Sequence, residues 1–278
     1  MPARGIVIAM RRVLVTGMSG LIGAAVRRRL EGRWALRALN RRPVEGVETH
    51  QADIADLDAI GPAFRDVDAV VHLAANVAGP AGAPGWEAVL RDNVIGTYHV
   101  FEAARRAGVR RVVFASSGAT VSRIEREPPY AALAAGRYDE AVEWPMLTHE
   151  SPMRPSGLYG CSKIWGEALA RHLADTTDTS MICLRIGHVS VEDRPVKPRE
   201  FSVWCSLRDI AQAVERSLVA PADVRFGVFF ITSENKWSYR DIEHARAVLG
   251  YVPEDRAEDH RQHGELQPKA RRADTRMP

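Results

Sequence analysis

A glycine-rich turn between an apolar run and a helical pattern is the feature that most constrains the fold of this chain. Residues 13–15 read Val-Leu-Val, and the following Thr-Gly-Met-Ser-Gly-Leu-Ile-Gly places glycines at positions 17, 20 and 23. Glycines at this spacing allow a tight turn, close approach of the backbone to a pyrophosphate and close packing of the next helix. A helix from about Leu21 to Glu31 would offer its N-terminal amides to the phosphates. The alternative is a strand-turn-helix that binds no ligand.

Apolar runs and helical patterns alternate along the rest of the chain. The runs that predict buried strands are Val13–Thr16, Ala35–Leu39, Val47–Gln51, Ala69–Leu73, Val112–Ala115, Met181–Ile186 and Val228–Ile231. The helical patterns are Leu57, Ile60 and Phe64, then Val89 to Ala107, then Ile210, Val214 and Leu218. This alternation predicts an α/β fold of the Rossmann type, with a doubly wound parallel sheet.

The regularity of this pattern suggests a division of the chain. We expect a Rossmann domain over residues 1–186, a small substrate-binding lobe over 187–265, where the rhythm loosens, and a disordered tail over 266–278. Residues 123–156 are too many for a simple connection. They are expected to carry a lid or a short extra helix.

Composition excludes several other classes of protein. The net charge of +3 with 26% charged residues gives no reason to expect a nucleic-acid or membrane partner. The three cysteines, Cys161, Cys183 and Cys205, are widely spaced and predict neither a metal site nor a disulfide framework. No apolar run reaches the length of a membrane span. We therefore expect a cytoplasmic protein that acts on a small molecule.

The end of the second predicted strand bears on the choice of dinucleotide. An acidic side chain there would bond a ribose 2′-hydroxyl, whereas arginines suit a 2′-phosphate. The sequence reads Asn40-Arg41-Arg42, which favours NADP(H) and keeps NAD(H) as an alternative. Two solvated arginines are the simpler interpretation. Asp53 is placed to contact the adenine, or it caps a helix.

The fourth predicted strand ends at His72, and the small residues after it would let a cofactor pass. His72 itself is expected to be a packed core histidine. The complete set of residues expected to bind the cofactor is Gly17, Ser19, Gly20, Leu21, Ile22, Gly23, Asn40, Arg41, Arg42, Asp53, Ile54, Leu73, Ala74, Ala75, Asn93, Tyr159, Lys163 and Ile186.

A second motif, Tyr159-Gly-Cys-Ser-Lys163, supplies candidate catalytic groups. Residues four apart on a helix project from one face, so the phenol and the ammonium would lie together. The ammonium, with an oxidised nicotinamide, would favour the phenolate and give a general acid/base near neutral pH. Ser117, with Ser116 as reserve, follows the fifth predicted strand at the edge where open α/β sheets bind ligands. An exposed helix pair and ordinary turn serines are the alternatives.

These motifs together resemble an extended short-chain dehydrogenase/reductase of the NAD-dependent epimerase/dehydratase family. The resemblance rests on TGMSGLIG, DNVIGT at 92–97, VVFASS at 112–117 and YGCSK at 159–163. The second half is similar to uronate dehydrogenases, through RPSGLYGCSKIWGEALAR, CLRIG, REFSVW and LGYVPEDRAED. The resemblance implies hydride transfer between a nicotinamide cofactor and a sugar carbon, with Ser117, Tyr159 and Lys163 as catalytic residues. It also implies a homodimer through the helices around Asp92 and Tyr159.

The resemblance further implies that Arg199 grips a substrate carboxylate, and that Asn76, Ser117, Gly118 and His188 also contact the substrate. Two of these positions depart from the uronate enzymes. Gly118 stands where they have a polar side chain, and His188 stands where they have a small hydroxyl. The chain also lacks their acid after strand two. A sugar epimerase with tightly held NAD, and a cofactor-binding sensor or scaffold without catalysis, therefore remain as alternatives.

Overall fold

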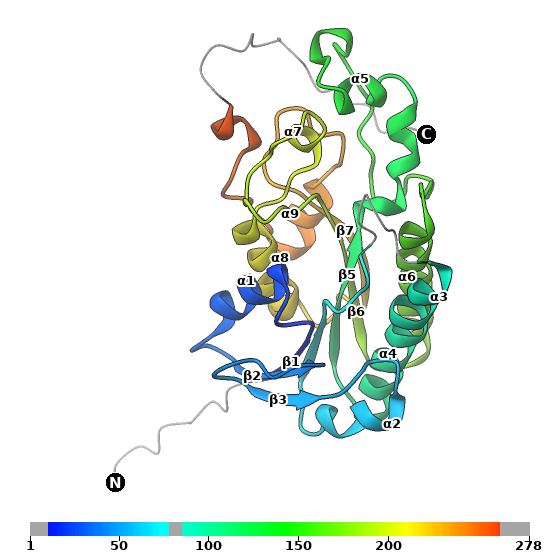
Figure 1. Cartoon of the computed structure of the whole chain (residues 1–278), viewed down its shortest axis with the longest axis vertical. Helices are drawn as coiled ribbons and strands as arrows, with labels where there is room; N and C mark the ends of the chain where they lie inside the picture. Colours follow the sequence, from blue (N-terminus) through cyan, green and yellow to red (C-terminus); the bar gives the residue numbers. More distant parts are fainter. Residues whose placement is uncertain (1–10, 78–84, 262–278) are drawn as a thin grey trace.

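The computed structural model describes residues 11–77 and 85–261, and its centre is a parallel sheet of seven strands (Figure 1). Their order across the sheet is β3-β2-β1-β4-β5-β6-β7, and each neighbouring pair is parallel. The strands are β1 (Arg12–Thr16), β2 (Ala35–Asn40), β3 (Glu48–Gln51), β4 (Ala69–His72), β5 (Arg111–Ser117), β6 (Ser180–Ile186) and β7 (Phe226–Ile231). The seven predicted runs match these strands to within two residues at either end, so the expected fold class is confirmed.

Helices connect the strands and cover both faces of the sheet. They are α1 (Leu21–Leu30), α2 (Leu57–Ile60), α3 (Trp86–Val89), α4 (Gly96–Arg106), α5 (Tyr130–Ala134), α6 (Leu158–Thr176), α7 (Glu200–Val203), α8 (Leu207–Val219) and α9 (Glu243–Leu249). Short helical turns are η1 (Gly61–Phe64), η2 (Leu90–Ile95), η3 (Gly118–Thr120), η4 (Ser122–Arg126), η5 (Tyr138–Glu140) and η6 (Ala257–His260). None of the helices among the described residues is long and apolar enough to cross a membrane.

Side-chain alternation along the strands assigns each helix to a face. On β1, Val13 and Val15 belong to the core that α1, α8 and α9 cover. Leu14 between them points to the opposite core, formed with α2, α4 and α6 (Figure 1). Because successive side chains of a strand point to opposite faces, one buried Val-Leu-Val run serves both cores.

Two predicted helices are less regular than expected. The pattern over 89–107 is interrupted by the π-helical turn η2 before α4 begins. The pattern from Leu57 to Phe64 passes from α2 into the 3-10 turn η1, where Pro62 lacks the amide hydrogen that an α-helix needs.

The sheet continues beyond the expected domain boundary at residue 186. β7 pairs with β6 along its whole length, and α8 packs against α1. Residues 187–206 and 232–242 lie over the carboxyl end of the sheet, which is where a substrate-binding lobe is expected, whereas α9 packs against a face of the sheet. The division into two domains stays a prediction. The expected tail, 266–278, lies outside the described residues.

Residues 123–156 contain the expected extra helix, α5, and form a third hydrophobic core with the C-terminal part of the chain. Tyr138 stacks on Trp237 with ring centroids 3.8 Å apart, and the indole of Trp144 donates to the carbonyl of Ser238 at 3.0 Å. Trp144 and Trp237 are each 1% exposed. This segment is therefore a well-packed part of the protein that lies above the sheet.

Removing the indole of Trp144 tests that role. Trp144→Ala should lower the free energy of unfolding by about 3–5 kcal/mol, because a large buried side chain leaves a cavity. Chemical denaturation measures the change. The exposed Trp86 on α3 is the matched control, and Trp86→Ala should change stability by no more than about 0.5 kcal/mol. Equal stability of the two variants would contradict a structural role for the segment.

Candidate active site

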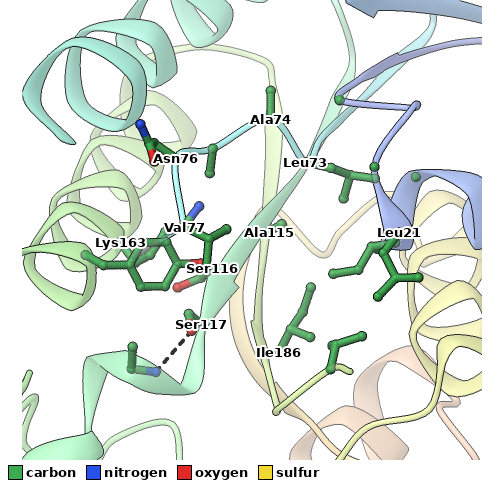
Figure 2. A pocket seen from close by; sticks show the side chains of 18 of the residues that line it. Leu21, Leu73, Ala74, Asn76, Val77, Ala115, Ser116, Ser117, Lys163 and Ile186 are labelled. Atoms are coloured by element: carbon green, nitrogen blue, oxygen red, sulfur yellow. Dashed lines mark hydrogen bonds between the residues drawn. The ribbon is translucent and has the colours of Figure 1, made fainter. Parts of the chain in front are cut away.

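A cleft of about 1550 Å³ opens at the carboxyl end of the strands. The glycine turn and α1 form one side, and the ends of β4 and β5 with α6 form the other. Figure 2 shows Leu21 and Leu73 on one side of this space and Lys163, Ser117 and Asn76 on the other. Most of the residues predicted to bind cofactor or substrate line this one cleft, although they are far apart in the sequence.

The glycine turn fits a dinucleotide because its backbone leaves no room for side chains where the chain folds back. Gly17 has a φ of +72°, and a Cβ there would lie 2.8 Å from the backbone nitrogen of Ala74. A Cβ on Gly23 would lie 2.6 Å from the Cα of Met18. Among the described residues no side chain caps the N-terminus of α1, and its first turn holds no acid. Its amides therefore face the cleft with a partial positive charge suited to phosphate.

His72 is a core histidine, as expected. Its side chain is 1% exposed and bonds Thr16 at 2.7 Å and Thr97 at 3.1 Å. Burial lowers the pKa of His72 to about 3, so the ring is neutral. The Thr16 hydroxyl also accepts from the amide of Ala74 at 3.1 Å, which ties the glycine turn to the end of β4.

The far end of the cleft carries the side chains expected to meet the adenosine. Asn40 accepts from the amide of Met18 at 3.0 Å, so this side chain supports the glycine turn. Arg41 and Arg42 line the cleft and are exposed. Asp53 also lines it, accepts from the amide of Ala55 at 2.9 Å and pairs with Arg91 at 2.6 Å. Asp53 therefore caps its own turn as well as facing the cleft.

Asn93 is the one predicted cofactor residue that does not line the cleft within the described chain. It is 2% exposed, accepts from the amide of Asn76 at 2.7 Å, and donates to the carbonyl of Asn76 and to Ser162. Asn76 itself lines the cleft. A buried amide needs partners for its polar atoms, and Asn93 finds them in the Asn76 backbone and in Ser162. Asn93 therefore holds the loop after β4 from the side away from the cleft.

The three predicted catalytic side chains meet in the cleft. Ser117, Tyr159 and Lys163 all line it, and the Lys163 Nζ lies 5.5 Å from the centre of the Tyr159 ring. The same Nζ lies 4.8 Å from the centre of the Phe114 ring. Lys163 is 3% exposed. Its position one helical turn after Tyr159 on α6 brings the two side chains to one face.

Burial dominates the titration of both groups. It lowers the pKa of Lys163 to about 8, against an opposing effect of the Glu167 carboxylate. It raises the pKa of Tyr159, and the neighbouring Ser117 side chain offsets this rise only in part. The expected depression of the tyrosine pKa is therefore not present in the protein alone. It would need the positive charge of an oxidised nicotinamide ring.

Ser116, the reserve candidate, is engaged elsewhere. Its hydroxyl donates to Glu167 at 2.5 Å, and Glu167 is held by Arg185 at 2.8 and 2.9 Å. Ser116 is 3% exposed. The geometry therefore favours Ser117, which lines the cleft with Tyr159 and has no such bond to Glu167 among the described residues, over Ser116.

The substrate end of the cleft differs most from expectation. Arg199 lines the cleft, but its guanidinium forms a bidentate pair with Glu125, at 2.5 and 2.9 Å. Glu125 also accepts from the hydroxyl of Tyr239 at 2.6 Å. His188 lines the cleft with its Nε2 3.2 Å from Glu200, and burial lowers its pKa. Arg199 is thus already partnered by a carboxylate of the chain.

Sequence reasoning missed several residues that line the cleft, among them the charged residues Glu125 and Arg240. Glu125 lies in the segment 123–156, and Arg240 follows β7 by nine positions. Neither belongs to a motif. The only signal for Arg240 was indirect, namely the glycine at position 118 that leaves space for its side chain.

Comparison with known proteins agrees with this geometry. The family model described as "NAD dependent epimerase/dehydratase family" matches residues 13–216. An NAD-dependent glucose-6-phosphate dehydrogenase of Haloferax volcanii is 34% identical, over 91% of this chain and 97% of that protein. A uronate dehydrogenase of Pseudomonas putida is 33% identical, over 92% of this chain and 89% of that protein.

A solved structure leads to the same group. The crystal structure of uronate dehydrogenase from Agrobacterium tumefaciens aligns with a TM-score of 0.75 and 32% identity, over 94% of this chain and 92% of that one. Likeness in both sequence and structure spans nearly the whole chain, so the expected resemblance and the expected enzyme class are confirmed. The chain belongs to the NAD-dependent epimerase/dehydratase family.

Proposed function

We propose that this protein is an NAD(P)-dependent dehydrogenase that moves a hydride between the nicotinamide and a hydroxyl or carbonyl carbon of a sugar or sugar acid. The observation that carries the proposal is that Ser117, Tyr159 and Lys163 line the same cleft as the glycine turn. This arrangement brings an acid/base and an oxygen-binding group to the place where a nicotinamide ring would meet a substrate.

Each catalytic side chain has one task in this proposal. Tyr159 takes the proton of the substrate hydroxyl, while Ser117 holds that oxygen by a hydrogen bond. The bound cofactor supplies the acceptor for the hydride. Lys163 lies beside the phenol, and its positive charge stabilises the phenolate as the proton moves. The same groups run in reverse when a carbonyl or lactone is reduced.

The comparisons favour a dehydrogenase over an epimerase. Three relatives of 32–34% identity are named as sugar dehydrogenases, the third being an L-arabinose 1-dehydrogenase (NAD(P)(+)) of Haloferax volcanii. A GDP-mannose 3,5-epimerase of rice is only 26% identical, and the match covers 45% of that protein. This difference in identity and coverage supports a net redox reaction.

NADP(H) remains the favoured cofactor in this proposal, with NAD(H) as the alternative. Residues 40–42 hold no carboxylate to bond a ribose 2′-hydroxyl. Arg41 and Arg42 line the cleft and are exposed, so a 2′-phosphate would gain two charge-assisted partners. The names of two relatives give different cofactors: the glucose-6-phosphate dehydrogenase is NAD-dependent, and the L-arabinose 1-dehydrogenase uses NAD(P)(+).

Replacing Tyr159 tests the acid/base assignment. Tyr159→Phe should lower turnover by about 10³-fold or more, because general acid/base groups contribute roughly 10²–10⁴-fold. The absorbance of reduced cofactor measures turnover, and fluorescence titration checks that cofactor binding is unchanged. Tyr98 is exposed on α4, so Tyr98→Phe should retain full activity. A fully active Tyr159→Phe enzyme would rule out the mechanism.

Lys163 offers a test in which activity and stability change in opposite directions. Its pKa falls from 10.5 in the unfolded chain to about 8 in the folded protein, so the unfolded state binds more protons between those pH values. Stability therefore rises with pH across this window, and the full burial cost is present below pH 8. Lys163→Met should abolish turnover, yet raise the free energy of unfolding at neutral pH by up to about 3 kcal/mol.

Urea denaturation of the cofactor-free variant from pH 7 to 10.5 measures this effect. The gain in stability should shrink toward the upper pH limit. Lys197 is exposed, and Lys197→Met should leave the pH profile of stability unchanged. A Lys163→Met protein that is less stable than the parent at neutral pH would contradict the burial cost.

The cofactor preference is tested at the two arginines. Changing both Arg41 and Arg42 to serine should raise the KM for NADP by about tenfold or more while leaving the KM for NAD nearly unchanged, because only NADP carries the 2′-phosphate. Initial rates with each cofactor measure the ratio. Arg28→Ser, at an exposed position of α1 away from the cleft, should change neither value. A double variant with equal losses for both cofactors would argue against a 2′-phosphate site.

A further inference from the structure

The guanidinium of Arg240 occupies the space that Gly118 leaves open. A Cβ built on Gly118 would overlap the Cζ and both terminal nitrogens of Arg240. Gly118 begins η3 and directly follows Ser117, so the guanidinium lies beside the proposed oxygen-binding serine. Gly118 departs from the uronate dehydrogenase pattern, and the Arg240 guanidinium occupies the space that a side chain at position 118 would fill.

Backbone contacts fix the position from which Arg240 enters the cleft. The amide of Leu147 donates to the carbonyl of Tyr239 at 2.7 Å, and the amide of Asp241 donates to the carbonyl of Leu147 at 2.9 Å. The amide of Arg240 donates to the Ser238 hydroxyl at 3.2 Å. Arg240 lines the cleft with 2% of its surface exposed. The segment 123–156 therefore holds the arginine in place on both sides.

Arg240 has fewer partners than a buried guanidinium requires. Its Nη2 donates to the carbonyl of Gly118 at 3.4 Å, and its Nε is buried with no hydrogen-bond partner among the described residues. The Glu125 carboxylate approaches the Nη2 only to 3.6 Å. A guanidinium has five donor hydrogens, and a buried charge is costly unless it is paired and bonded. Arg240 thus lacks a close acceptor.

The nearby carboxylates are committed to other groups. Glu125 is held by both donors of Arg199 and by the Tyr239 hydroxyl. Glu200 accepts from the amides of Val196 and Lys197 and contacts His188. One carboxylate, that of Glu125, is therefore shared by two guanidiniums. The guanidinium of Arg240 therefore keeps hydrogen-bond donors that an added anion could accept.

We propose that Arg240 binds the carboxylate of a sugar-acid substrate beside Ser117. A carboxylate matches the planar fork of a guanidinium, and its single charge suits an arginine that shares its one nearby carboxylate with Arg199. A phosphate dianion at this buried position would need more donors than Arg240 provides. Arg199 then acts as a positioning residue, because its pairing holds Glu125 against Arg240 and Tyr239. This inference rests on the proposed sugar dehydrogenase function and defines its substrate class.

Binding measurements test the proposal independently of turnover. Calorimetry on protein saturated with reduced cofactor would compare D-glucuronate, D-galacturonate, D-glucose and glucose 6-phosphate. At least one uronate should bind more tightly than glucose. Arg240→Met, which keeps much of the volume and removes the charge, should weaken that uronate about 10- to 100-fold and leave glucose unchanged.

A second variant guards against loss of folding in the first. Gly118→Ser places a side chain where the guanidinium lies, so it should cause the same selective loss for the uronate. Arg194 is exposed and outside the cleft, and Arg194→Met should leave every affinity unchanged. Thermal unfolding of each variant with and without cofactor confirms that the cofactor site is intact.

Three results would overturn the proposal. The first is that neither uronate binds more tightly than glucose. The second is that both variants weaken the binding of uronate and of glucose equally. The third is that glucose 6-phosphate binds most tightly and that its binding depends on Arg240. Selective uronate binding that is lost in Arg240→Met or Gly118→Ser supports it. If such binding occurs without hydride transfer, the proposed dehydrogenase function fails while the assignment of Arg240 stands.

Discussion

The rest of the cleft depends on the close approach of two backbone segments, the glycine turn after β1 and the end of β4. Gly17 lies so near Ala74 that no Cβ fits between them, and the Thr16 hydroxyl bonds the Ala74 amide. β1 and β4 are also the neighbours at which the strand order reverses direction. In open α/β sheets a crevice forms at that point, because the connections on its two sides run to opposite faces. The absence of side chains there lets a dinucleotide pass across the sheet.

Around this crevice the chain buries polar groups at some cost to its stability. Lys163 is held in a position where burial favours its neutral form, and Arg240 is held with few partners. Burying charges without full pairing is unfavourable for folding. Both groups stay in place because rigid elements position them, α6 for the lysine and the contacts with segment 123–156 for the arginine. Sites that bind charged or reacting groups commonly retain such unfavourable local arrangements.

Sequence reasoning succeeded where function depends on local spacing. The buried strands appear as short apolar runs, the turn as three glycines, and the Tyr159–Lys163 pair as a four-residue helical repeat. It was less successful where a side chain has a choice of partners. Asn93 supports Asn76 from behind the cleft, and Arg199 is paired with Glu125, a residue 74 positions away. Sequence spacing does not reveal such distant partners.

The sequence by itself therefore determined the strand-forming apolar runs, the glycine turn and the spacing of Tyr159 and Lys163, because each is a pattern of residues within a few positions of one another. Only the tertiary structure decided how charge is distributed at the substrate end of the cleft. Glu125, Arg199 and Arg240 come from three separate segments, and the bonds between them depend on how those segments pack above the sheet. Whether a buried arginine is neutralised or left with free donors is set by atoms within a few ångströms in space, and those atoms are distant in the chain.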